Sequence, residues 1–153
     1  MSEASAKTKG MSYSIINRGD ATNAGGRRNY LDYLDMGVSK ATNGFARAQI
    51  VCNKRGAAPP TGWHYHQCDV QIVYFIKGWS DLEFEDGNAL RAKAGDVLCI
   101  PGGLIHNEGE CSDDIEFYEV SVPAEMGTVA VDPPDGFTQV YGERVPKRSK
   151  ALA

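Results

Sequence analysis

The sequence predicts an all-β protein, either a sandwich or a barrel. Short segments with strand-like alternation recur at a spacing of about 8–12 residues, which is typical of these two architectures. Turn-forming pairs lie between them, in a chain of 153 residues with 17 glycines and 7 prolines. No internal repeat and no long helical pattern interrupts the series, and the length suits a single domain.

The first part of the chain contains one strong strand prediction. Residues 1–28 predict a flexible leader or arm, because the beginning is polar and rich in small residues. Residues 27–37 predict a short helix or an edge strand, between which periodicity does not decide. Residues 44–56 predict a strand, and we expect Arg47 to share a face with Phe45, Gln49 and Val51.

The later elements follow from turn chemistry. Residues 80–85 and 89–94 predict a hairpin around Asp86-Gly87-Asn88. The "VLCI" segment at 97–100 predicts another strand, and residues 113–123 predict a last strong strand that Pro123 closes. We expect a single domain over 29–132, a loop-like segment at 131–136 and a C-terminal tail over 133–153.

Composition argues against several functional classes. The net charge of −4 gives no general attraction to nucleic acid or to anionic membranes. No apolar run approaches the ~18 residues of a membrane span, and no secretory signal is visible. The four cysteines show no C-x-x-C spacing, so we expect reduced thiols in a cytoplasmic protein.

The three histidines predict a metal site. His64 and His66 stand two positions apart, so in a strand both project from one face. Two imidazoles on one face can converge on an ion, whereas they fill a core poorly because each carries a polar nitrogen. The remaining histidine, His106, follows the Pro101-Gly102-Gly103 turn and would supply the third ligand.

Gln71 poses a problem of register. It stands five residues after His66, so a continuous strand would place the two on opposite faces. A loop or bulge within residues 67–70 would bring Gln71, Val73 and Phe75 inward and leave Ile72, Tyr74 and Ile76 outward. Because both sets are apolar, we expect a second subunit or the N-terminal arm to cover the outer face.

These two segments resemble the cupin family. "HYHQCDVQIVYFIKG" is similar to the first cupin motif, H-x-H-x4-E-x6-G, with Gln71 in place of the glutamate. "GDVLCIPGGLIH" matches every fixed position of the second motif, G-x5-P-x-G-x2-H. The resemblance implies a double-stranded β-helix (jelly-roll) barrel of two antiparallel sheets with its core at about 43–123. It also implies a homodimer and one divalent metal ion per chain.

The Gln71 position bears on the chemistry. Three neutral histidines with a neutral amide would leave a divalent site at formal +2, which weakens metal binding and favours an anionic ligand. The pattern resembles the three-histidine dioxygenases among cupins, so we expect a metal-dependent enzyme acting on a small oxygenated organic anion, with Fe(II) favoured and Mn, Ni or Zn as alternatives. Two other functions remain as alternatives: an isomerase or lyase, and a non-catalytic binding or sensory protein. For Gln71, the alternative to direct metal contact is a hydrogen bond to a histidine or to a water molecule.

Three further residues are candidates for the site. Arg47 would hold a substrate carboxylate if its strand turns that face inward. Glu119 or Tyr118 would act as the acid or base, depending on which face of the last strand lines the interior. Burial would then raise the pKa of Glu119.

Overall fold

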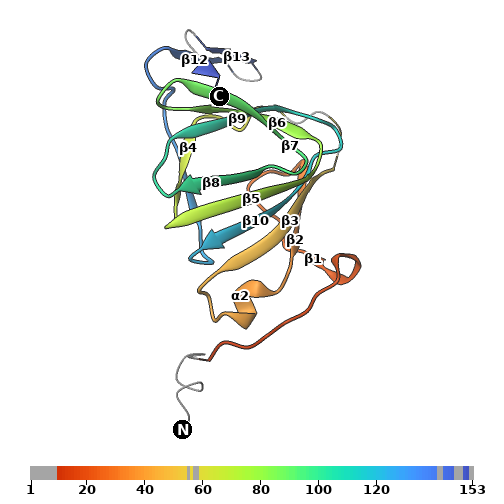
Figure 1. The fold of residues 1–153 in the computed structure, drawn as a ribbon. Helices are drawn as coiled ribbons and strands as arrows, with labels where there is room; N and C mark the ends of the chain where they lie inside the picture. Colours follow the sequence, from red (N-terminus) through yellow and green to blue (C-terminus); the bar gives the residue numbers. More distant parts are fainter. Residues whose placement is uncertain (1–9, 55, 57–58, 141–142, 147–149, 152–153) are drawn as a thin grey trace.

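The chain folds as two facing β-sheets, as the sequence predicts. The computed structural model describes residues 10–151 except 55, 57–58, 141–142 and 147–149. The first sheet has the order β1-β2-β3-β10-β5-β8 and the second β11-β4-β9-β6-β7-β14 (Figure 1). All pairings within these two sheets are antiparallel except that of β14 with β7. This is the predicted double-stranded, jelly-roll type of architecture.

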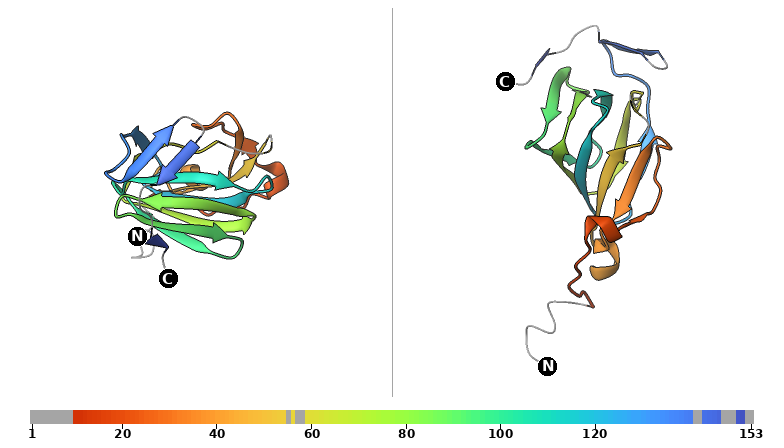
Figure 2. Two further views of the ribbon diagram at one scale, coloured as in Figure 1. Left: turned by 90° about the horizontal axis from the view of Figure 1, so that it is seen from above. Right: turned by 90° about the vertical axis from the view of Figure 1, so that its right-hand side faces the viewer.

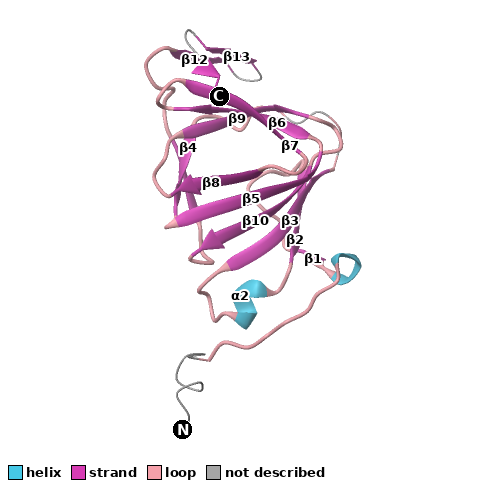
Figure 3. Cartoon of the chain, in the orientation of Figure 1, coloured by secondary structure: helices cyan, strands magenta, loops and turns pink. Residues whose placement is uncertain are grey.

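The strands account for most of the described chain, and the helices are single turns (Figure 3). The first sheet contains β1 (Thr22–Asn23), β2 (Leu31–Asp35), β3 (Arg47–Asn53), β5 (Val70–Lys77), β8 (Val97–Pro101) and β10 (Glu116–Val122). The second contains β4 (His64–Gln67), β6 (Trp79–Phe84), β7 (Asn88–Lys93), β9 (His106–Cys111), β11 (Gly127–Ala130) and β14 (Lys150–Ala151). A separate hairpin joins β12 (Phe137–Val140) to β13 (Glu143–Pro146), and the helical turns are η1 (Arg18–Asp20) and α2 (Val38–Ala41).

Two local predictions are confirmed in detail. The chain breaks between β4 and β5, and β5 then alternates: Gln71, Val73 and Phe75 are buried, while the residues between them are exposed. The β6–β7 hairpin turns at Gly87, which adopts φ +86°. Only glycine enters this left-handed region at no steric cost, which is why the turn forms there.

Four other segments either decide between predicted alternatives or form strands that were not predicted. Residues 31–35 form a strand, so the strand alternative for 27–37 holds. Residues 127–130, for which no strand was predicted, form β11 beside β4, and within the expected tail residues 137–140 pair with residues 143–146. Residues 106–111 form β9 although their composition is polar. The leader prediction for residues 1–9 lies outside the described residues.

The core and a cavity lie between the two sheets. A cluster of Val73, Phe75, Leu82, Phe84, Ala92 and Ile115 fills one part of the interior. Figure 2 shows the segment before β1 leaving the barrel at one end and the β12–β13 hairpin lying beyond the other. No helix in the described part of the chain is long and apolar enough to cross a membrane.

Candidate metal site

Three histidines and one glutamate converge from two neighbouring strands of the second sheet. His64 and His66 come from β4, and His106 stands directly opposite His64 at the start of β9. Glu108 follows two positions later, so it shares the face of His106. One ligand atom from each residue lies within 4.8 Å of the others. The histidine part of the predicted ligand set is therefore brought together around one point.

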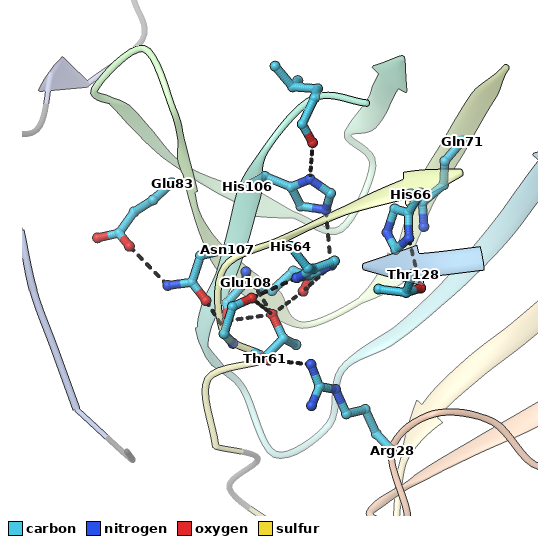
Figure 4. A network of polar contacts seen from close by, with 12 residues as sticks. Arg28, Thr61, His64, His66, Gln71, Glu83, His106, Asn107, Glu108 and Thr128 are labelled. Carbon is cyan, nitrogen blue, oxygen red and sulfur yellow. Dashed lines mark hydrogen bonds and ion pairs between the residues drawn. The ribbon is translucent and has the colours of Figure 1, made fainter. Parts of the chain in front are cut away.

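Hydrogen bonds at the far side of each ring orient the histidines (Figure 4). His64 Nδ1 lies 2.6 Å from the Gly62 carbonyl oxygen, and His106 Nδ1 lies 2.9 Å from the Leu104 carbonyl oxygen. Because carbonyl oxygens only accept, both rings carry a proton on Nδ1, so in the neutral form of each ring the lone pair is on Nε2. His66 Nδ1 lies 3.1 Å from the Thr128 hydroxyl, which orients the third ring. Such outer partners are usual around metal-binding histidines.

The donor set fits a first-row divalent ion. The Nε2 atoms of His66 and His106 are buried and have no hydrogen-bond partner within the described residues. A buried nitrogen without a partner is costly, and an ion would satisfy both of them. Imidazole nitrogens with one carboxylate suit zinc, iron, nickel and manganese. His64, His66, His106 and Glu108 are the residues that could hold such an ion.

Glu108 was not among the predicted ligands. Its Oε2 lies 3.7 Å from His64 Nε2, and its Oε1 lies 3.7 Å from His106 Nε2. Thr61 donates its hydroxyl proton to Oε2, and the Glu108 N–H donates to the same Thr61 hydroxyl oxygen at 3.1 Å. With Glu108 among the ligands, the set would carry one negative charge, and a divalent site would stand at formal +1 in place of the +2 expected for a neutral set.

The protonation states within the cluster differ by position. Burial lowers the pKa of His66 to about 4, and burial also lowers the pKa of His64. Burial acts in the same direction on His106, but Glu108 outweighs it and raises that pKa above its usual value. Burial would raise the pKa of Glu108, yet His106 and His64 together lower it. At neutral pH, His64 and His66 are therefore neutral, as metal binding requires.

The other predicted residues lie on the first sheet. Gln71 Nε2 donates to Glu119 Oε2 at 2.8 Å, and Gln49 Nε2 donates to Glu119 Oε1 at 2.7 Å. Arg47 Nη2 lies 3.6 Å from the same Oε1. Burial raises the pKa of Glu119, and these three neighbours oppose the shift. Gln71 thus contacts Glu119 through its nitrogen; its role as a metal ligand stays a prediction that concerns only the free Oε1.

The strand register decides whether Tyr118 or Glu119 faces the interior. Ile115, Phe117 and Glu119 line the cavity, whereas Tyr118 projects from the opposite face of β10 and is not a lining residue. The expectation that left Tyr118 as an acid or base for the interior is corrected for that reason. Arg47 does line the cavity, on the face predicted for its strand.

The cavity connects the two groups of polar residues. Its volume is about 220 Å³, and both sheets contribute to its wall. His64, His66 and Glu108 line it from the second sheet, and Arg47, Gln71 and Glu119 line it from the first. Arg27 and Arg28 from the segment before β2 also line it, and Arg28 donates to the Thr61 carbonyl oxygen. A small molecule in this cavity would contact both sheets.

The fold resembles that of several solved structures. The polyketide cyclase RemF from Streptomyces resistomycificus is 17% identical with a TM-score of 0.61, covering 80% of this chain and 88% of that one. KdgF from Halomonas sp. is 19% identical with a TM-score of 0.56, covering 74% and 96%. The nucleoside dehydratase Pac13 from Streptomyces is 17% identical with a TM-score of 0.55, covering 78% and 92%.

No protein-family model and no curated protein matches the sequence. Oxalate decarboxylase from Bacillus subtilis, 18% identical with a TM-score of 0.56, matches over 79% of this chain and 32% of its own length. Identities this low are informative about the fold alone. With the two facing sheets and the histidine–glutamate cluster, they show that this chain has a cupin-type β-barrel fold.

Proposed function

We propose that the chain is a metal-dependent enzyme that moves a proton on a small oxygenated organic anion, in an isomerase- or lyase-type reaction. The observation that carries this proposal is the buried carboxyl group of Glu119 in the wall of the cavity that His64, His66 and Glu108 also line. Burial raises the pKa of this carboxyl group, and a carboxylate with a raised pKa is a stronger base towards a substrate proton than an exposed one.

The charge of the cavity wall favours an anion. The lining residues include three arginines and two glutamates, a net charge of +1 before any ion is bound. A bound divalent ion would supply a Lewis acid that polarises a substrate oxygen and lowers its pKa. Arg27 and Arg28 lie where they can attract the anion, and Glu119 lies on the other sheet, within reach of the carbon framework.

The dioxygenase hypothesis takes second place. It depended on a ligand set without a carboxylate, and the position of Glu108 beside the histidines argues against that premise. The solved enzymes with a similar fold include a polyketide cyclase and a nucleoside dehydratase, names that are compatible with proton-transfer chemistry. Binding without turnover is the remaining alternative. The exchange experiment below distinguishes it from proton transfer and from oxygenation.

The test uses proton exchange as a reaction-independent readout. Protein reconstituted with zinc, manganese, nickel or anaerobic iron(II) is incubated in D2O with 2-oxo acids, hydroxy acids and aryl ketones, and deuterium at carbon is followed by NMR. Wild type should catalyse metal-dependent exchange on one class, while Glu119→Gln should keep its metal and lose the exchange. Oxygen uptake with iron would favour a dioxygenase, and binding without exchange or uptake would favour a binding protein.

We also propose a homodimer in a reducing, cytoplasmic setting. Ile72, Tyr74 and Ile76 are 38–45% exposed on the outer face of β5, and Val97 on the adjacent β8 is 66% exposed. A second copy would bury this apolar strip. All four cysteines are free, as expected of a reducing compartment. Sedimentation of wild type and Tyr74→Lys tests the dimer, and a monomeric wild type would contradict it.

A further inference from the structure

Three buried polar atoms on the first sheet have no hydrogen-bond partner within the described residues. They are Arg47 Nε, Gln71 Oε1 and Ser121 Oγ. The two other atoms of this kind are the histidine nitrogens that the candidate metal site explains. A buried polar atom without a partner destabilises the fold, so proteins keep few of them. Three together require an explanation.

The three residues lie side by side across three strands. Ser121 on β10 stands opposite Arg47 on β3 and opposite Gln71 on β5. Side chains paired in this way have Cβ atoms about 4.5–5.5 Å apart. Arg47 and Gln71 line the cavity, and Ser121 lies between them with 1% of its surface exposed. We call Arg47, Ser121 and Gln71 the polar row.

The polar row and Glu119 together carry no net charge. Arg47 and Glu119 have opposite charges and lie 3.6 Å apart. The row therefore has little to attract a second anionic group. It offers one N–H donor on Arg47, one acceptor on Gln71 and one hydroxyl that can do either. The Gln71 acceptor is well defined, because its amide nitrogen already donates to Glu119.

An uncharged hydroxyl group matches this set of atoms. It accepts from Arg47 Nε and from the Ser121 hydroxyl and donates to Gln71 Oε1, so one hydroxyl group gives each of the three atoms a partner. A carboxylate would leave the Gln71 oxygen without a donor. The cavity wall elsewhere is largely apolar, with Val73, Leu98 and Phe117 among the lining residues, and suits a carbon framework between two polar ends.

We propose that the polar row is a second binding subsite, which holds an uncharged hydroxyl group of the molecule whose anionic oxygen lies at the metal site. The proposal rests on the proposed function and narrows its substrate class to hydroxylated organic anions with an apolar body. Specificity would follow, because an analogue without the hydroxyl would leave the row unpaired.

The test compares ligands that differ by one hydroxyl. Zinc-loaded protein is titrated calorimetrically with salicylate and with each dihydroxybenzoate that adds a hydroxyl at another ring position. One isomer should bind wild type about tenfold more tightly than salicylate, the effect expected of one or two hydrogen bonds. In Ser121→Ala that ratio should fall towards one, while the affinity for salicylate and one zinc per chain are retained.

A stability measurement provides an independent arm. Ser121→Ala removes a hydroxyl without a partner, so its unfolding midpoint should equal or exceed that of wild type. Ser112→Ala is the matched control, because Ser112 Oγ accepts from the Trp79 N–H at 2.9 Å, and its midpoint should fall. An equal fall in Ser121→Ala would mean that the hydroxyl has a structural role and would overturn the proposal.

The outcomes separate this proposal from the one on which it rests. Suppose that salicylate binds only when zinc is present. If no isomer then gains affinity, or if the gain persists in Ser121→Ala, the polar row is not a hydroxyl-binding subsite, while the metal site is supported. If wild type retains no zinc, or binds salicylate equally without it, the proposed function fails. The stability comparison then still decides whether the row is a free polar site.

Discussion

Replacing Glu108 by glutamine tests whether it completes the candidate metal site. The side chain keeps its shape, and the amide oxygen can still accept from the Thr61 hydroxyl, so the barrel should remain folded. The change removes the only negative charge of the cluster. Residues that merely orient a metal ligand cost about 10- to 100-fold in affinity when replaced. A direct ligand should cost at least about 100-fold, or about 2.7 kcal/mol.

The assay is competition for zinc against a chelating dye of known affinity, with circular dichroism to check the fold. Glu110→Gln is the matched control, because Glu110 lies on the same strand but is exposed and outside the cluster. Its zinc affinity should equal that of wild type. Unchanged affinity in folded Glu108→Gln would show that the three histidines bind the ion without Glu108, and the corrected charge of +1 would be wrong.

Three further predictions follow from individual contacts. Glu119→Gln should change the pH dependence of stability, because burial raises the pKa of Glu119 above its ordinary 4.5 in the folded protein. Wild type should therefore be most stable relative to the variant below pH 4.5 and should lose that advantage as the pH rises through the folded pKa. Urea unfolding at several pH values measures the difference. Gly102→Ala should cost about 3 kcal/mol in the same assay, because a Cβ would lie 1.6 Å from the Cys68 carbonyl oxygen; an unchanged midpoint would contradict this packing. Thr128→Val should weaken zinc binding about 10- to 100-fold by removing the partner of His66 Nδ1, and wild-type affinity would show that this contact does not orient the ring.

Local patterns in the sequence were sufficient to predict that the two histidines of β4 point in the same direction. The spacing of His64 and His66 determines that they share a face in any strand, and this property needs no knowledge of which strand lies beside which. The buried side of β5 was not determined in this way, because both of its faces are apolar. That prediction depended on a break in register that turns Gln71 inward.

Glu108 and the contact of Gln71 depend on pairings that the sequence does not display. The segment 106–111 contains asparagine, glycine and two glutamates, which have low strand propensity, and it becomes a strand because β4 and β6 flank it. A strand prediction there would have placed Glu108 on the face of His106. Gln71 contacts Glu119 because β10 pairs with β5, a pairing between segments almost fifty residues apart.

The two backbone carbonyls that hold His64 and His106 lie only two residues before each ring. The orientation of these ligands is thus set within a tripeptide, and no ion is needed to impose it. We expect an emptied barrel to keep its ligands in place and to accept a replacement ion without refolding. The metal that the protein carries in a cell would then depend on the supply of ions during synthesis as much as on the protein itself.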